Sequence, residues 1–338
     1  MSGEGEVRVT VEKPPKDKWA WLKTLARVLL FVFGLSAVVY VVNEAGPQNV
    51  WNTLVAAGVF VPLIIALEAL FMSMDVMSLR ALIGAPAKNV PALVWLRSGF
   101  TAYAIMILLP GGRAAGEVAR AAQLGPYLGG GAKAAAYATR LQAVTLLGNT
   151  AISIPCAIAC FIAAGASEAL PWFVLGNGIG TGILGGLVVV AARKSSLGAW
   201  MGKRFPSFGQ QGASFDEALR QQTPWGAPIF ISFLGRAIQA VQYGILLLAV
   251  GGSLTFLSAL VSQGIHLVGA GLGDLIPNQV GITEGAYRVF APALGLADDA
   301  ASAIGIALLA RFCQFVLAAV GLAIGALSPA SKGAQHAA

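Results

Sequence analysis

The stretch "LLPGGRAAGEVARAAQLG", residues 108–125, decides how this chain is interpreted. It places a proline, a glycine pair and the charged residues Arg113, Glu117 and Arg120 in a chain that is 57% hydrophobic and only 11% charged. Apolar runs of roughly 20 residues occur on both sides, and this length crosses the hydrocarbon core of a bilayer. A polar break between such runs indicates irregular backbone at membrane depth, which protein or water must surround.

The apolar runs predict an all-α integral membrane protein with about six full transmembrane helices. The expected spans are 22–42, 55–79, 133–165, 169–192, 226–250 and 299–327. They form one membrane domain, residues 21–328, between polar tails at 1–20 and 329–338. A loop at 193–225 separates the halves, and its motif "SFDE" (214–217) predicts a short surface helix that begins at Ser214.

Basic residues indicate the orientation of the spans, because Lys and Arg accumulate on the cytoplasmic side. Lys13, Lys16 and Lys18 precede the first span, and "RKSSLGAWMGKR" (193–204) follows the fourth. We therefore expect both tails and the loop 193–225 in the cytoplasm, and the protein in a bacterial-type inner membrane. The net charge of +7 lies largely at span ends, so it predicts no nucleic-acid partner.

This orientation leaves two segments that each start and end on one side of the membrane. Residues 92–131 would do so on the cytoplasmic side and residues 255–296 on the other. Each segment fits two short helices joined at membrane depth, which is a re-entrant hairpin. The residues expected to shape the two hairpins are Pro110, Gly111, Gly112, Gly116, Pro277 and Gly281.

The two hairpin sequences align with each other. "LIPNQVGITEGAYRVF" (275–290) matches "LLPGGRAAGEVARAAQ" (108–123), and in both a glutamate follows the proline by seven residues. Downstream, "RLQ" (140–142) aligns with "RFCQ" (311–314). Residues 55–165 and 226–327 are therefore predicted to form an inverted repeat, an architecture of secondary transporters with sites at broken helices near the midplane.

The paired motifs "LPGGRAAGEVAR" and "IPNQVGITEGAYR" resemble those of the lysylphosphatidylglycerol synthase transmembrane domain family, also called flippase-like membrane proteins. The resemblance covers about residues 20–330 and departs from the family pattern at Asn278 and Gln279, which replace the usual glycines. It implies a stand-alone member that moves a lipid or a lipid-linked head group between leaflets. It does not imply lysyl transfer, because the aminoacyl-transferring members carry an additional soluble domain.

Charged side chains at membrane depth also point to a transport site. Each costs ~3 kcal/mol or more on insertion scales, so it must be paired or face a cavity. Charged residues at such positions are Glu68, Asp75, Arg97, Arg113, Glu117, Arg120, Arg140, Arg236, Asp274, Glu284, Arg288 and Arg311. Arginine's planar fork suits a lipid phosphate. The candidate substrate-binding residues are Arg113, Glu117, Arg120, Arg140, Gln142, Asn278, Gln279, Glu284, Arg288, Arg311 and Gln314.

The expected partner is a membrane lipid, and its identity stays open. An anionic phospholipid, an aminoacylated lipid, a polyprenyl-phosphate sugar and a hopanoid all fit a transporter of this kind. We expect no enzymatic activity and no cofactor, because neither metal-ligand spacing nor a Gly-Lys-Ser/Thr phosphate loop is present. The structural alternative is that Glu117 only stabilises its helix by pairing with Arg113 or Arg120, at i,i+4 and i,i+3 spacing.

Two other classes of function are compatible with parts of the sequence. "GLGD" (271–274) matches the signature of intramembrane aspartyl proteases, which need a second aspartate to share a proton. The available partner, Asp75, follows Met74 and not the tyrosine that the signature requires. A scaffold that positions a lipid-modifying enzyme without transporting lipid is the remaining alternative.

Overall fold

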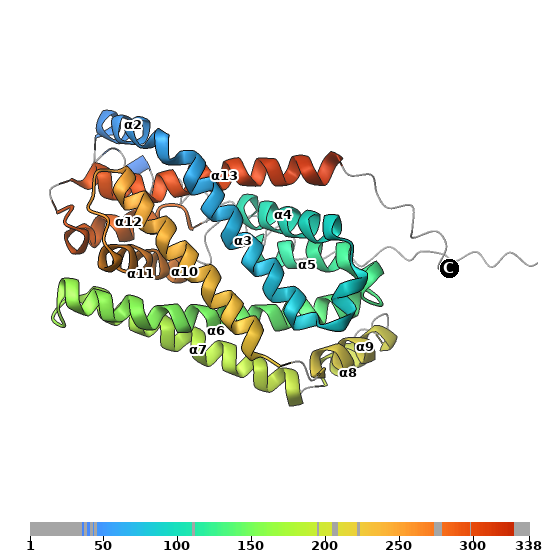
Figure 1. Cartoon of the computed structure of the whole chain (residues 1–338). Coiled ribbons are helices and arrows are strands. Elements are labelled where there is room, and N and C mark those ends of the chain that lie inside the picture. The colour runs from blue at the N-terminus through green and yellow to red at the C-terminus, as the bar shows by residue number, and fades with distance from the viewer. Residues whose placement is uncertain are drawn as a thin grey trace, which may run out of the picture.

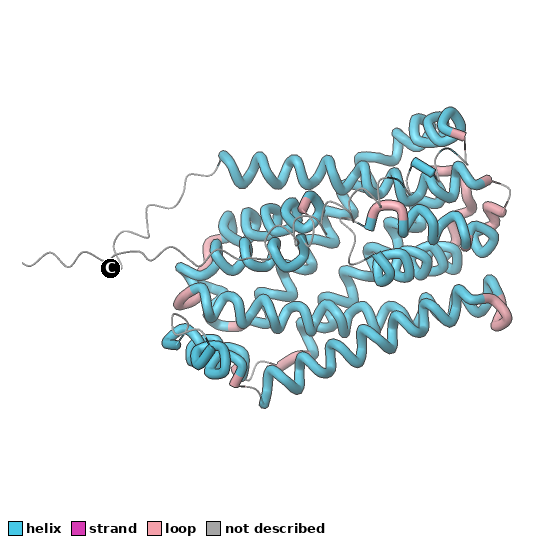
Figure 2. Tube along the Cα trace, turned by 180° about the vertical axis from the view of Figure 1, so that it is seen from behind, coloured by secondary structure: helices cyan, strands magenta, loops and turns pink. Residues whose placement is uncertain are grey.

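The computed structural model shows an all-helical bundle (Figure 1). It describes residues 46–109, 112–194, 196–204, 209–221, 224–273, 279–297 and 299–327, and the single positions 36, 39, 40 and 43. Within these ranges there is no β-strand. Seen from behind, the helices are joined by short loops (Figure 2).

Among the described residues, five helical stretches are long and apolar enough to cross a membrane. The first runs from Pro47 to Ile83 and comprises α2 (Pro47–Ala56), η1 (Ala57–Phe60) and α3 (Val61–Ile83). The others are α6 (Gly131–Ala164), α7 (Ala169–Lys194), α10 (Gly226–Ala249) and α13 (Ala300–Leu327). Five predicted spans are thereby confirmed as helices, whereas span 22–42 lies outside the described residues except for helical positions 36, 39 and 40.

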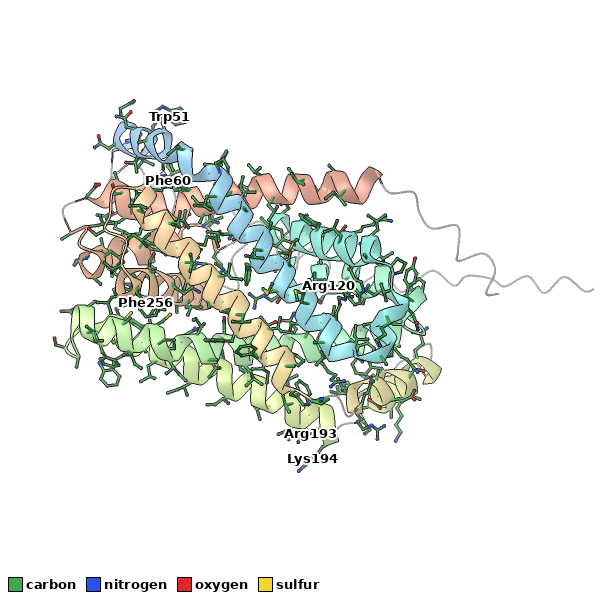
Figure 3. All side chains as sticks on the ribbon, viewed as in Figure 1. Trp51, Phe60, Arg120, Arg193, Lys194 and Phe256 are labelled. Atoms are coloured by element: carbon green, nitrogen blue, oxygen red, sulfur yellow. The ribbon has the colours of Figure 1, made fainter. Side chains whose placement is uncertain are left out.

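Large apolar side chains cover the outside of the long helices. Ile158 and Ile162 of α6 are 56% and 67% exposed, and Leu187 of α7 is 59% exposed. A soluble helix would turn such residues inward, whereas a membrane-spanning helix is apolar on all sides. Arg193 and Lys194 lie at one end of α7, and Phe256 lies toward the opposite end of the bundle (Figure 3). The chain is therefore a multi-pass membrane protein.

The first predicted hairpin is an antiparallel pair of helices, α4 (Ala92–Leu108) and α5 (Gly112–Leu124). A Cβ atom at Gly116 would lie 2.6 Å from the carbonyl oxygen of Ala102, and one at Gly112 would overlap the carbonyl oxygen of Met106. These two glycines let the backbones of α4 and α5 touch. The short η3 (Gly125–Tyr127) then leads into α6.

The second hairpin pairs α11 (Phe256–Gly273) with α12 (Ile282–Val289), followed by η6 (Ala291–Leu294). A Cβ atom at Gly269 would lie 3.0 Å from the Cα of Thr283. Adding 167 to the numbers of the first contact, Ala102 and Gly116, gives the second contact, Gly269 and Thr283. Pro110 and Pro277 differ by the same shift. The sequence repeat therefore recurs in the backbone contact of each hairpin.

Helices of the first half of the bundle pack against helices of the second half. Helix α3 packs against α10, α4 packs against α13, and α11 packs against α6. Each hairpin thus contacts the long helix that follows the other hairpin. In Figure 1 the pair α4–α5 lies at the right of the bundle and the pair α11–α12 at the left. The hairpins approach each other from opposite ends of the long helices.

The connector between the halves differs in one respect from its prediction. It contains α8 (Leu197–Arg204) and α9 (Gly209–Arg220), so Ser214 lies inside α9 and does not begin it. The carboxylate of Asp216 accepts hydrogen bonds from the backbone N–H groups of Gly198 (2.7 Å) and Ala199 (2.9 Å). The aspartate of "SFDE" therefore satisfies two of the free N–H groups that the start of α8, like every helix N-terminus, presents.

Candidate functional site

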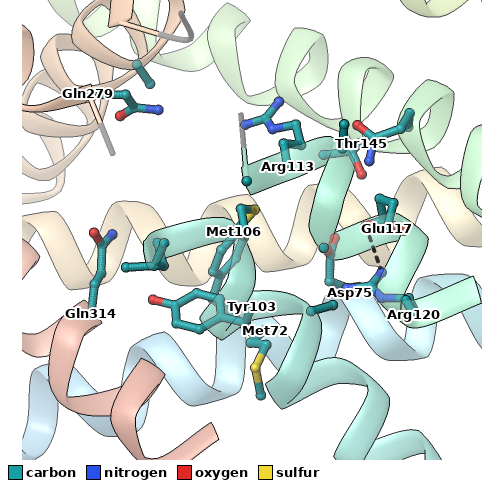
Figure 4. A pocket seen from close by; sticks show the side chains of 18 of the residues that line it. Met72, Asp75, Tyr103, Met106, Arg113, Glu117, Arg120, Thr145, Gln279 and Gln314 are labelled. Atoms are coloured by element: carbon teal, nitrogen blue, oxygen red, sulfur yellow. Dashed lines mark ion pairs between the residues drawn. The ribbon is translucent and has the colours of Figure 1, made fainter. Parts of the chain in front are cut away.

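A cavity of about 890 Å³ lies where the two hairpins meet the long helices. Helices α3, α4, α5, α6, α10, α11 and α13 form its wall, together with Gln279 and Thr283 of the second hairpin. Figure 4 shows Arg113, Glu117 and Arg120 on one part of this wall, and Gln279 and Gln314 on another. The charged lining residues are four arginines and three acids: Arg113, Arg120, Arg236, Arg311, Glu68, Asp75 and Glu117.

Helix α5 contributes the charged group of the opening motif. Arg113, Glu117 and Arg120 follow one another at spacings of four and three residues, so they share a face of the helix. Nη1 of Arg120 lies 3.3 Å from Oε1 of Glu117, and Arg120 is 5% exposed. Within the described part of the chain, Nε and Nη1 of Arg120 and Oε2 of Glu117 make no hydrogen bond. The Glu117–Arg120 pair is therefore buried with part of its hydrogen-bonding groups unpartnered among the described residues.

The second hairpin holds its glutamate differently. Glu284 is fully buried, and its Oε1 accepts from Nη2 (2.7 Å) and Nε (3.0 Å) of Arg311 on α13. Its Oε2 accepts the backbone N–H of Gly281 at 2.8 Å, and Gly281 has the positive φ of 83° that favours glycine. Glu284 thus lies behind the cavity wall, where it fixes both the start of α12 and the guanidinium of Arg311.

Arg140 was expected at the site, and the structure places it elsewhere. It is fully buried on another face of α6, with its guanidinium carbon 4.9 Å from the ring centre of Trp225. The reason appears when α6 is compared with α13, the equivalent helix of the other half. The cavity-lining residues of α13 are Ala307, Ala310, Arg311 and Gln314. Subtracting 172 from these numbers gives four residues of α6 that also line the cavity: Ala135, Ala138, Thr139 and Gln142.

This shift of 172 gives the structural register between α6 and α13. Gln142 and Gln314 correspond, as the sequence alignment predicted, but the counterpart of Arg311 is Thr139 and not Arg140. An error of one residue rotates a position by about 100° around a helix. That rotation is sufficient to move Arg140 from the cavity to the Trp225 side of α6.

The candidate residues divide into four groups. Gln142, Gln279 and Gln314 line the cavity with Arg113, Glu117, Arg120 and Arg311. Of the described candidates, Arg140, Glu284 and Arg288 do not line it. Gly112 and Gly116 lie in the wall and Gly281 begins α12. Pro110, Gly111, Pro277, Asn278 and the protease-like Asp274 lie outside the described residues.

A second polar wall was not assigned to the site from the sequence. Glu68 of α3 is 2% exposed and accepts hydrogen bonds from the hydroxyl of Tyr103 (2.6 Å) and from Nε2 of Gln242 (2.7 Å). Arg236 of α10 donates to Oε1 of Gln239 at 2.9 Å and lies 5.0 Å from the ring centre of Phe71. Asp75 completes the charged part of this wall.

The sequence does contain a signal for this second wall. Glu68 and Asp75 are seven residues apart on α3, and Arg236, Gln239 and Tyr243 recur at three and four residues on α10. Polar residues at these spacings share one face of an otherwise apolar helix. Among the described residues, no group of three or more His, Cys, Asp or Glu side chains is arranged to hold a metal ion.

Comparison with known proteins identifies the family of this chain. No curated protein and no solved structure matches the chain. A family model described as the lysylphosphatidylglycerol synthase TM region matches residues 25–321, which include every described residue that lines the cavity. The matched region covers most of the 338 residues. The chain therefore belongs to the family of the lysylphosphatidylglycerol synthase transmembrane region.

Proposed function

We propose that this protein moves a membrane lipid between the leaflets of a bilayer, with the lipid head group passing through the charged cavity. The observation that carries the proposal is the position of the four arginines and three acids, which line a cavity inside a bundle of apolar helices. Ionisable groups at such depth are costly and typically mark substrate or ion pathways.

The electrostatics of the cavity suit a lipid head group. Arg120 and Arg311 have carboxylate partners in Glu117 and Glu284. Arg113 and Arg236 also line the cavity, and the guanidinium fork of arginine binds phosphate through two parallel hydrogen bonds. Arg113 is exposed, so its guanidinium is accessible to a phosphate that enters the cavity. Anionic phospholipids, aminoacylated lipids and polyprenyl-phosphate sugars all carry this group.

In this proposal the protein is not an enzyme, and its hairpins are re-entrant from opposite faces of the inner membrane. Helix α7 ends with Arg193 and Lys194, and α8 ends with Lys203 and Arg204. The positive-inside rule favours the cytoplasm for this end of the bundle. Both chain termini would then be cytoplasmic, and the first hairpin would enter from the cytoplasmic side.

The test is lipid movement in reconstituted liposomes that contain a fluorescent phosphatidylglycerol or phosphatidylethanolamine, followed by dithionite quenching of the outer leaflet. Glu117→Gln should slow movement about tenfold or more, because a hydrogen bond to a charged group contributes ~1.5–3 kcal/mol. The matched control is Glu217→Gln, since Glu217 is a surface residue of α9 whose side chain is 72% exposed and paired with Lys133.

The control variant is expected to move lipid at the wild-type rate. Wild-type liposomes that exchange neither lipid faster than protein-free liposomes would contradict the proposal for phospholipids. Equal rates for Glu117→Gln and the wild type would instead be consistent with transport but would show that Glu117 does not contribute to it.

A further inference from the structure

The cavity is exposed along only one part of its wall. Six of its lining residues are exposed: Leu109, Arg113, Ala114, Val118, Ala122 and Gly131. All six lie between positions 109 and 131: Leu109 caps α4, Gly131 begins α6, and the other four lie on α5. The other described lining residues, including those of α11, α12 and α13, are buried or half-buried. Among the described lining residues, the exposed ones therefore lie along α5, which places a mouth of the cavity there.

Helix α5 presents two different stripes at this mouth. Ala114, Val118 and Ala122 recur every four residues and form an apolar, exposed edge, and Val118 is 70% exposed. The charged residues Arg113 and Glu117 each precede a member of this stripe by one position, which rotates them about 100° around the helix. The apolar edge and the charged face therefore run side by side along α5.

A membrane lipid has the same division into a polar and an apolar part. A cavity of about 890 Å³ has the size that encloses a molecule as large as a typical drug, which suits a head group without its hydrocarbon tails. The tails would have to remain outside, and an apolar edge beside the charged face offers them a surface. A lipid tail that lies on this apolar edge contacts only apolar side chains there, so no polar group of the edge loses its hydration.

We propose that Ala114, Val118 and Ala122 form a lateral portal, over which the lipid's hydrocarbon tail lies while its head group occupies the cavity. The inference rests on the proposed function and adds the route by which the lipid enters. It also assigns separate roles to neighbouring residues of one helix: Arg113 and Glu117 contact the head group, and Val118 contacts the tail.

The first test fills the portal without changing a charge. Val118→Trp places an indole at the mouth and should slow lipid movement about tenfold or more in the dithionite assay, a rise in barrier of ~1.4 kcal/mol. Val190→Trp is the matched control, because Val190 is also an exposed valine (51%) but lies on α7, away from the cavity. The control should move lipid at the wild-type rate.

A second test does not depend on transport. The photoreactive residue p-benzoylphenylalanine is placed at position 118 or 190, in vesicles of phosphatidylglycerol, and lipid adducts are quantified by mass spectrometry. The adduct at 118 should decrease when Arg113→Gln is added, because the head group then loses its contact. The adduct at 190 should not change, since bulk lipid supplies it.

The outcomes separate the portal from the proposed function. Wild-type rates for Val118→Trp, or an adduct at 118 that is insensitive to Arg113→Gln, would overturn the portal even if the protein transports lipid. A wild-type protein that transports no lipid, but whose adduct at 118 depends on Arg113, would overturn the proposed function and retain the portal as a lipid-binding site.

Discussion

At the scale of single residues, the two hairpin glutamates have different partners although their motifs align. Glu284 is bound across helices by Arg311 of α13, whereas Glu117 is paired with Arg120 of its own helix. The cause lies in the structural register, because Thr139 stands in α6 where α13 has Arg311. The second hairpin is therefore bound to the long helix α13 by a buried ion pair, whereas the equivalent position of α6, Thr139, cannot form one with the first hairpin.

The position of Arg140, on the Trp225 side of α6 and outside the cavity, predicts the effect of substituting it. Its Nε, Nη1 and Nη2 make no hydrogen bond within the described part of the chain, and its guanidinium packs on Trp225. Arg140→Met keeps an elongated apolar side chain in that space and removes a buried charge, so stability should be unchanged or increased. Lipid binding should also be unchanged, because Arg140 does not line the cavity.

Thermal unfolding in detergent and native mass spectrometry with phosphatidylglycerol would measure both effects. Arg120→Met is the informative comparison, because Arg120 lines the cavity, and it should weaken lipid binding about tenfold, or ~1.4 kcal/mol. If Arg140→Met weakened binding as much as Arg120→Met, Arg140 would belong to the site after all.

At the scale of the elements, each hairpin depends on close contact between two backbones. In the first hairpin the small residue at the contact is Gly116 of α5, and in the second it is Gly269 of α11. The glycine therefore stands on the returning helix in one repeat and on the entering helix in the other. Either position permits the approach, since only one of the two facing residues has to lack a side chain.

A methyl group at the contact of the first hairpin should be destabilising. The Cβ of Gly116→Ala would lie 2.6 Å from the carbonyl oxygen of Ala102, so we expect α4 and α5 to separate at a cost of ~1–3 kcal/mol. Gly285→Ala in α12 is the control, because no other described part of the chain, beyond the turn of helix around it, lies within 4 Å of its added Cβ. There the gain in helix propensity should stabilise the protein by up to ~1 kcal/mol.

The measurement is the melting temperature of the purified protein in one detergent. Gly116→Ala should melt at a lower temperature than the wild type, and Gly285→Ala at the same or a higher one. Equal melting temperatures for the two variants would show that the α4–α5 contact is not tight in solution.

At the scale of the whole molecule, the arrangement of the halves determines from which side each hairpin enters. The long helices are shared between the halves, with α4 packed on α13 and α11 packed on α6. The hairpins enter this frame from opposite ends (Figure 1). If the long helices span a membrane, the bases of the two hairpins must be on opposite sides of it.

Cysteine labelling in intact cells or oriented vesicles tests this arrangement directly. Pro126 and Ala297 are exposed and lie next to the bases of the first and second hairpins, respectively. The native Cys156, Cys160 and Cys313 are buried, so they should contribute little background. Pro126→Cys should react with a membrane-impermeant maleimide from the cytoplasmic side, and Ala297→Cys from the other side. Reaction of both from one side would contradict the opposed entry of the hairpins.

The sequence by itself determined the helical membrane class, the five described spans, the two helical hairpins and the charged residues of α5. Each of these follows from a local pattern, namely the length of an apolar run, a proline–glycine break or a spacing along one helix. Such patterns depend only on neighbours in the chain, so they can be interpreted without knowledge of the fold.

Only the tertiary structure decided which charged residues share the cavity. The rotation of α6 placed Thr139 and not Arg140 opposite the hairpin, and the packing of α3 against α10 added Glu68, Asp75 and Arg236 to the wall. The tertiary structure also decided that the mouth of the cavity lies along α5. These facts depend on helix rotation and on contacts between distant segments. Because one residue corresponds to about 100° around a helix, an alignment that is wrong by one position assigns a side chain to another face.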